Sequence, residues 1–295
     1  AHYWPEFAAN GKDSIRVRDV LCHRSGVGAL SVKVEDAAIY DWSTMIALIE
    51  QQAPWFEPDS TQAYSPFIYG WILGELVRRV AGMETFTAYF QSEIAEPLGL
   101  NFHFGVPEGV ELADIGPLKT AKPAPSSLTQ TIKSDPAGMI GQSFTNPISL
   151  IVGTNSEAWR GAEIPAANGH TNAYSLAALY GAIANNGQLQ GRKVLSESLL
   201  NFCETELSCA DDEVLLAPLR FSHGFMMSGE RRDCYFGGPR GFGHPGAGGC
   251  LGFADPARNL GVGFVTNRVG QELLIDQRML ALIEAIYACE GISDE

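Results

Sequence analysis

Apolar positions recur every three or four residues along much of the first two hundred residues, which is the period of a helix with one buried face. Residues that can cap a helix precede several of these runs. Helices are therefore predicted over 14–22, 41–52, 66–80, 84–94, 172–184, 196–205 and 272–288. The stretch 104–170 is rich in Gly, Pro, Ser, Thr and Asn and shows no strong period. We expect irregular loops there, of the kind that often wall a binding cleft.

The pattern changes to strands over about 219–267. Residues 241–267 predict two strands joined by a turn at 255–259, where proline can set the backbone angle of the second turn position. The opening of the first strand, 244–249, carries almost no side chains. Glycine weakens a strand and often marks a place where another group approaches the backbone closely. We therefore expect a ligand to lie against this strand.

The order of these elements indicates the fold class. Helices come first, strands follow late, and a final amphipathic helix can cover the sheet. This order predicts an α/β (α+β) fold with an antiparallel sheet flanked by helices and a mostly helical inserted lobe. We expect one domain over 1–295, with the helical lobe at about 14–205 and the sheet with its last helix at about 206–295.

Composition narrows the set of partners. The chain has 295 residues, 45% apolar and 18% charged, with a net charge of −14 and no run of Lys or Arg. These are values of a globular protein with a substantial core. Nucleic acid and anionic membranes would need a basic patch, so we expect neither as a partner. No apolar run reaches the roughly 18 residues of a membrane span.

Cysteine and histidine spacing gives no support for a disulfide framework or a metal site. The six cysteines are scattered and contain no Cys-x-x-Cys pair, so we expect buried reduced thiols. The six histidines show no His-x-x-x-His or His-Glu-x-x-His spacing. We therefore expect no metal and no cofactor. Since nucleic acid and anionic membranes are also disfavoured, the partner that we expect is a small molecule.

Single residues with catalytic side chains have ordinary structural explanations when each is taken alone. Ser65 is a good helix N-cap, because Pro66 then takes the first helical position. Tyr64 fits a half-buried aromatic, His23 a helix end, and His244 a turn. There is no Gly-x-Ser-x-Gly elbow, and Gly-x-Gly at 241–243 precedes a strand and not a helix. An α/β-hydrolase and a dinucleotide-binding fold are therefore unsupported.

The combination of motifs changes this interpretation. The chain contains His23-Arg24-Ser25-Gly26, Tyr64-Ser65, Gly243-His244-Pro245-Gly246, Asp255-Pro256 and Val265-Thr266-Asn267. With these motifs it resembles the class C β-lactamase-related serine hydrolases, which include class C β-lactamases, D-alanyl-D-alanine peptidases and family VIII carboxylesterases. The resemblance covers essentially the whole chain from Tyr3-Trp-Pro-Glu-Phe onward, and it is greatest to the esterase branch.

The resemblance implies a serine carboxylesterase of the β-lactamase-like fold. In this family a serine in Ser-x-x-Lys attacks an ester or amide carbonyl and forms an acyl-enzyme. Tyr64 matches the tyrosine that shares protons with the serine, and it can act as a base near neutrality only if a nearby cation lowers its pKa. Further candidate site residues are Ala247, Gly246 and Gly248 for the oxyanion and acyl site, and His244 and Ser65 for substrate binding. A single oxyanion donor such as the Ala247 N–H is worth on the order of 10²–10³ in rate.

Two departures from the family pattern favour an esterase over a β-lactamase. Pro66 stands where the second motif of the family has asparagine. His244 stands where β-lactamases carry lysine, and Pro245 where they carry threonine. The alternatives that stay open are a D-alanyl-D-alanine peptidase or β-lactamase, and a non-catalytic β-lactamase-like binding protein.

A third departure concerns the nucleophile. The six lysines are Lys12, Lys33, Lys119, Lys122, Lys133 and Lys193, and none has a serine three positions before it. In the family this motif lies upstream of the segment that resembles Tyr3-Trp-Pro-Glu-Phe. We therefore expect the nucleophile helix, its lysine and the N-terminal strands to lie upstream of this chain, and the chain to be inactive alone.

The same reasoning leaves three further points open. A separate N-terminal fragment that carries Ser-x-x-Lys is one partner that the sequence allows, and a homo-oligomer is another. We expect a cytoplasmic protein, and a periplasmic or secreted one stays open because a signal peptide would lie in the upstream part.

Overall fold

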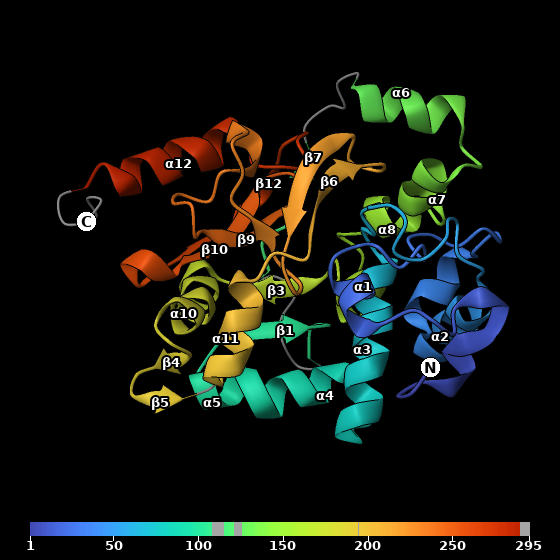
Figure 1. Ribbon diagram of the computed structural model, residues 1–295, viewed down its shortest axis with the longest axis horizontal. Coiled ribbons are helices and arrows are strands. Elements are labelled where there is room, and N and C mark those ends of the chain that lie inside the picture. Colours follow the sequence, from blue (N-terminus) through green and yellow to red (C-terminus); the bar gives the residue numbers. More distant parts are fainter. Residues whose placement is uncertain (108–114, 121–125, 194, 290–295) are drawn as a thin grey trace.

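The computed structural model describes residues 1–107, 115–120, 126–193 and 195–289. Figure 1 shows the helices of residues 1–81 gathered on one side of the molecule and the largest sheet on the other. The α-helices are α1 (Val17–Leu21), α2 (Trp42–Gln51), α3 (Ile68–Ala81), α4 (Phe86–Phe90), α5 (Glu96–Leu98), α6 (Ser127–Ser134), α7 (Met139–Thr145), α8 (Ser149–Val152), α9 (Glu157–Gly161), α10 (Ala173–Ala184), α11 (Glu197–Glu204) and α12 (Gln277–Tyr287). Short 3₁₀ segments lie at Pro5–Gly11, Asp36–Tyr40, Arg232–Cys234 and Pro256–Arg258, and a π-helical turn at Gln91–Ala95 joins α4 to α5.

The largest sheet is antiparallel and six-stranded, in the order β11-β10-β9-β8-β7-β6. Its strands are β6 (Ser208–Asp212), β7 (Ala217–Phe221), β8 (Met226–Met227), β9 (Phe242–Gly246), β10 (Cys250–Asp255) and β11 (Leu260–Phe264). Three two-stranded pairs are formed by β1 (Phe102–Phe104) with β3 (Gly169–Thr171), β2 (Lys119–Thr120) with β12 (Arg268–Val269), and β4 (Gln188–Leu189) with β5 (Arg192–Lys193). Spatial neighbours in the large sheet are also neighbours along the chain. Their connections are short turns, except for the longer one over 228–241 between β8 and β9, which includes the 3₁₀ segment Arg232–Cys234.

Helices cover both faces of this sheet. On β10, Leu251 and Phe253 point to one face, where they share a buried cluster with Met279 of α12. Gly252 lies on the opposite face, where a Cβ added to it would meet the ring of Tyr180 of α10 at 2.1 Å. This arrangement follows from the alternation of side chains along a strand. Figure 1 shows α12 and α10 on opposite sides of β9 and β10.

Glycines on β11 let α10 lie directly on the strand backbone. A Cβ on Gly261 would come within 2.0 Å of the Gly181 nitrogen, and one on Gly263 within 2.4 Å of the Ala177 nitrogen. Any side chain at these two positions would therefore push the helix off the sheet. Part of the glycine content of the late strands thus serves the packing of a helix.

The helices of the first hundred residues pack around a second core, which includes Trp4, Trp71 and Ile49. Leu150, Trp159 and Ile164 from later in the chain complete this core. Lys12 is fully buried beside it, and its amine donates hydrogen bonds to the carbonyl oxygens of Ala9 at 2.8 Å, Glu50 at 2.9 Å and Gln52. All three donors of the amine are used, so this buried lysine ties the N-terminal segment to the end of α2.

Several predicted helices are confirmed, whereas the predicted irregular stretch and the start of the last helix are wrong. Helices near 41–52, 172–184 and 196–205 are present, with Asp41, Asn172 and Ser196 as side-chain N-caps. The stretch expected to be irregular contains four short helices, α6 to α9, which a periodicity of so few turns does not reveal. The final helix begins at Gln277 and not at 272, because Asp276 caps it.

The strand region also differs from the prediction. The predicted single strand that starts at 241 is two antiparallel strands, β9 and β10, joined by a three-residue turn at 247–249. The turn at 255–259 between β10 and β11 is confirmed. Strand β6 begins at Ser208, before the predicted strand region, and its polar sequence gave no apolar alternation to find it by.

Candidate active site

Tyr64 lies just before α3 and is held there by a carboxylate from the sheet. Its backbone N–H donates to Asp212 Oδ1 at 3.1 Å. The same oxygen accepts the N–H groups of Val214 at 3.0 Å and Leu215 at 2.9 Å, in the turn between β6 and β7. Asp212 is almost fully buried, so each of these bonds offsets part of its desolvation. Gln62 adds a β-bridge to Asp212, so the segment before Tyr64 is an extension of the sheet edge.

Two histidines meet the ring of Tyr64. The ring of His23, which follows α1, lies 4.7 Å from that of Tyr64, and the ring of His244 on β9 stacks on it at 5.7 Å. Tyr69 of α3 stacks on His23 at 4.8 Å, and Phe221 of β7 meets His23 edge-on at 4.7 Å. The structure thus brings together the candidate residues Tyr64 and His244, which are 180 positions apart in the sequence.

His23 is a neutral ring with a defined tautomer. Its Nδ1 accepts the backbone N–H of Ser65 at 3.2 Å, so in the neutral ring the proton lies on Nε2. Burial, and secondly the neighbouring His244, lower the pKa of His23 to about 3. Its backbone φ of 59° is in the left-handed region, which is uncommon for a residue other than glycine. Such backbone conformations cluster at functional sites.

His244 is also uncharged. Its Nδ1 lies 2.7 Å from the carbonyl oxygen of Pro245, which can only accept, so Nδ1 carries the proton and Nε2 is an acceptor with no donor among the described residues. Burial lowers the pKa of this ring. The resemblance places a lysine at this position in β-lactamases, and the present site has a neutral imidazole in its place.

The phenol of Tyr64 is protonated in this environment. Burial raises the pKa of Tyr64, and the charge of Asp212 raises it further. Basic action by Tyr64 requires a cation that lowers its pKa, and no such cation acts on it among the described residues. Within these residues Tyr64 is therefore suited to pass a proton on and not to hold a negative charge.

Ser65 and Cys22 offer no free nucleophile beside Tyr64. Ser65 is buried, and its Oγ accepts the N–H of Tyr69 at 3.1 Å and contacts the carbonyl oxygen of Gly28 at 3.4 Å. The prediction that Ser65 is the N-cap and Pro66 the first helical residue is wrong, because α3 begins at Ile68. Burial raises the pKa of the Cys22 thiol to about 11, which keeps it in the unreactive thiol form.

The candidate oxyanion residues lie at the end of β9 (Gly246) and in the turn that follows it (Ala247 and Gly248). The Gly249 N–H donates to the Gly246 carbonyl at 3.0 Å, and the Gly248 N–H donates to the Glu272 carbonyl at 2.9 Å. Ala247 is exposed, and its N–H has no hydrogen-bond partner within the part of the chain that the structure describes. Of the three candidates, Gly248 has used its donor, and Ala247 presents a free one.

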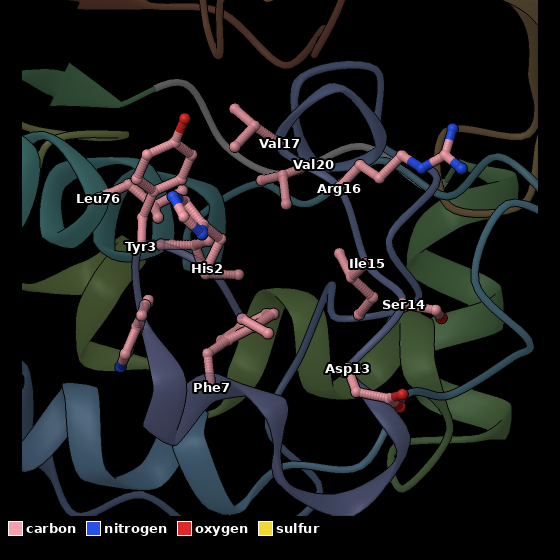
Figure 2. Close-up of a pocket in the computed structure, with 13 residues that line it drawn as sticks. His2, Tyr3, Phe7, Asp13, Ser14, Ile15, Arg16, Val17, Val20 and Leu76 are labelled. Atoms are coloured by element: carbon pink, nitrogen blue, oxygen red, sulfur yellow. The ribbon is translucent and has the colours of Figure 1, made fainter.

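A groove of about 470 Å³, which Tyr64 does not line, lies between the N-terminal segment, α1 and α3 (Figure 2). Apolar side chains form much of its lining, among them Phe7, Ile15, Val20, Ile72 and Leu76. Figure 2 shows Tyr3, Val17 and Val20 around one end of this space and Phe7 and Asp13 around the other.

Sequence reasoning missed three residues that build the site. His23 was interpreted as a helix end, although its place in the His23-Arg24-Ser25-Gly26 motif was a usable signal. Tyr69 was masked by the apolar face of its helix. Asp212 left no signal, because it is one of several acidic residues in a stretch without a pattern, and only the fold places it beside Tyr64.

Comparison with known proteins now defines the class. Residues 1–285 match the family described as Beta-lactamase, so the chain belongs to the beta-lactamase family of serine hydrolases and has its α/β fold. The curated relative "Esterase/beta-lactamase LipL" of Mycobacterium tuberculosis is 32% identical over 290 residues, which cover 93% of this chain. The chain spans 64% of the length of that relative.

Solved structures agree with this assignment. A family VIII carboxylesterase is 33% identical with a TM-score of 0.88, over 98% of this chain and 75% of that one. A penicillin-binding protein homologue from Caulobacter crescentus is 34% identical with a TM-score of 0.82, over the same shares of the two chains. Among the residues that the structure describes, we find no helix with the length and apolarity that a bilayer crossing requires.

Proposed function

We propose that this chain forms the substrate-binding part of a serine esterase that cleaves short-chain carboxylic esters through an acyl-serine intermediate. The observation that carries the proposal is the neutral His244 ring stacked on Tyr64 at 5.7 Å. A cation at this position would suit a substrate with a carboxylate, as in β-lactams and D-alanyl peptides. A neutral imidazole lacks that attraction, which favours uncharged esters.

The residues have the following roles in this proposal. The serine oxygen forms a bond to the ester carbonyl carbon, and the Ala247 N–H donates to the oxygen that becomes negative. The serine proton passes to the Tyr64 oxygen while Tyr64 gives its own proton to the departing alkoxide, so the phenol is neutral before and after. Water then forms a bond to the acyl carbon, and the bond between that carbon and the serine oxygen breaks, which releases the carboxylic acid. The proton that the water loses passes through Tyr64 to the serine oxygen. The raised pKa of Tyr64 favours this relay over a free phenolate.

The nucleophile in this proposal lies outside these 295 residues, on a segment that carries Ser-x-x-Lys. Ser65 and Cys22 are engaged or protonated, and Lys12 is tied to three carbonyl oxygens. The greater length of the Mycobacterium tuberculosis relative leaves room for such a segment.

The groove in Figure 2 is where we place this segment. Tyr69, Ile72 and Leu76 lie on one face of α3, at the spacing of neighbouring turns. Tyr69 stacks on His23, whereas Ile72 and Leu76 line the groove together with Val20. An apolar helix laid along this face would therefore reach the ring of His23 at its end.

The test is turnover of p-nitrophenyl butyrate by the intact gene product that contains Ser-x-x-Lys. We expect hydrolysis by the intact product and none by the 295-residue chain alone. No ester hydrolysis, together with rapid acylation by a penicillin, would support a β-lactamase or peptidase instead. An intact mass that equals 295 residues and no labelling by a fluorophosphonate probe would support a non-catalytic binding protein.

A further inference from the structure

Arg278, the second residue of α12, reaches back to the turn that presents the Ala247 N–H. Its Nη2 donates to the Gly248 carbonyl oxygen at 2.7 Å, and its Nη1 donates to the Arg268 carbonyl oxygen at 2.7 Å. The Gly248 oxygen also accepts the Gly270 N–H at 2.6 Å. One guanidinium thus joins the glycine turn to the segment after β11.

The guanidinium is itself held in place by Asp276. Asp276 Oδ2 accepts Nε of Arg278 at 2.9 Å and Nη2 at 2.5 Å, in a two-pronged ion pair. Its other oxygen caps α12 by accepting the N–H groups of Arg278 at 2.8 Å and Met279 at 3.0 Å. Met279 and Leu280 are buried under the sheet, so the helix that carries Arg278 is fixed in the core.

The glycines of the turn are explained by these neighbours. A Cβ on Gly249 would lie 2.1 Å from Nη2 of Arg278, and a Cβ on Gly248 would lie 2.1 Å from Cγ1 of Val269. Both glycines also have positive φ, +122° and +85°, which other residues adopt only with strain. From the sequence, the missing side chains at 244–249 are interpreted as space for a ligand. In the structure, the absence of a side chain at Gly249 also leaves space for the guanidinium of Arg278.

We propose that Arg278, oriented by Asp276, is a positioning residue that holds the turn so that the Ala247 N–H stays aimed at the oxyanion. The proposal rests on the proposed esterase function. The turn is bound through Gly248, to Glu272, Gly270 and Arg278, whereas Ala247 is exposed and its N–H has no partner among the described residues. A donor that is already fixed stabilises developing charge without reorganisation, which is the source of its value in catalysis.

The experiment uses the intact gene product with Arg278→Ala, Arg278→Lys and the control Arg232→Ala. Arg232 forms an exposed ion pair with Glu284, which lies on α12 as Arg278 does, and Arg232 does not contact the turn. Two measurements are made: steady-state kinetics with p-nitrophenyl butyrate, which give kcat and KM, and hydrogen exchange, which gives the rate of the Gly248 amide. For Arg278→Ala we expect kcat to fall 10- to 100-fold with KM within twofold, and Gly248 exchange to rise at least tenfold. Arg278→Lys should lie between, since one ammonium group cannot reproduce the planar fork. Arg232→Ala should change none of these values.

Each possible result either supports or overturns the proposed role of Arg278. Faster Gly248 exchange with unchanged kcat would make Arg278 a merely structural contact and overturn the proposal. Unchanged Gly248 exchange would overturn it as well, whatever the activity. If Arg278→Ala does not fold, Arg278→Lys with full kcat overturns the proposal and a reduced kcat at constant KM supports it. An unmodified protein that turns over no ester refutes the esterase function itself, a failure that the exchange rates distinguish from failure of the Arg278 contact.

Discussion

The backbone N–H of Tyr64 donates to the carboxylate of Asp212, 148 residues further along the chain, at 3.1 Å. The ring that meets His23 and His244 thus takes its position from the edge of the sheet. We expect Asp212→Ala to lower the free energy of unfolding by about 2–4 kcal/mol, since one buried and two partly buried N–H groups lose their acceptor. Asp212→Asn keeps one acceptor oxygen and should cost less. Urea unfolding of both variants measures the difference, and equal losses would contradict this account.

Removal of the phenol oxygen should separate chemistry from folding. Tyr64→Phe keeps the ring that His23 and His244 contact and deletes the proton carrier. We expect kcat of the intact gene product for p-nitrophenyl butyrate to fall by about 10²–10⁴, the usual contribution of a general acid or base. The melting temperature should stay within a few degrees. A Tyr64→Phe protein with more than a tenth of the original kcat would remove Tyr64 from the mechanism.

The buried neutral His23 predicts a pH dependence of stability. Its pKa is lowered to about 3 in the folded chain, so the unfolded chain binds the proton more readily. Stability from this group is complete above pH 6.5 and is lost as the pH falls toward 3. At pH 5 we expect a loss of about 2 kcal/mol relative to pH 7. Urea titrations of His23→Gln should show a shallower slope over this range, whereas His2→Gln, at an exposed position, should keep the original slope.

The contact of α10 with β11 depends on the absence of a side chain. We expect Gly261→Ala to lower the free energy of unfolding by about 1–3 kcal/mol, because its Cβ would meet the Gly181 nitrogen at 2.0 Å. Gly181→Ala is the matched control, since a Cβ on Gly181 meets nothing within 4 Å. Alanine is the better helix former, so this control should be neutral or slightly stabilising. Similar losses in both variants would show that the close approach is not what matters.

The groove of Figure 2 can be tested by a pair of charge substitutions. Val17 lines the groove and is 40% exposed, and Val80 on α3 is 65% exposed outside it. In the intact gene product we expect Val17→Asp to cost about 1–3 kcal/mol of stability, because a carboxylate would face an apolar segment. Val80→Asp should be within 0.5 kcal/mol of the unmodified protein, as at most surface positions. In the 295-residue chain alone both should be nearly neutral, and a loss from Val17→Asp there would argue against a docked segment.

The sequence predicts the fold class and the elements with the clearest pattern. Helix α10, for example, is indicated by a capping residue, Asn172, and by a sustained apolar period. The sequence also predicts the association of Tyr64 with His244, through a family resemblance and not through spacing. The short helices α6 to α9 could not be predicted, since one or two turns show no measurable period. Asp212 and Arg278 could not be predicted either, because their roles arise from contacts between distant segments.

The packing of α10 on the bare backbone of β11 makes the part of the chain before residue 186 and the part after residue 191 mutually dependent. The helix ends at Ala184, and the large sheet begins at Ser208. A protease nick in the turns between Asn186 and Gly191 would therefore divide the polypeptide without dividing the protein. The two fragments would co-elute and unfold in a single transition, since each alone would leave an apolar face in water.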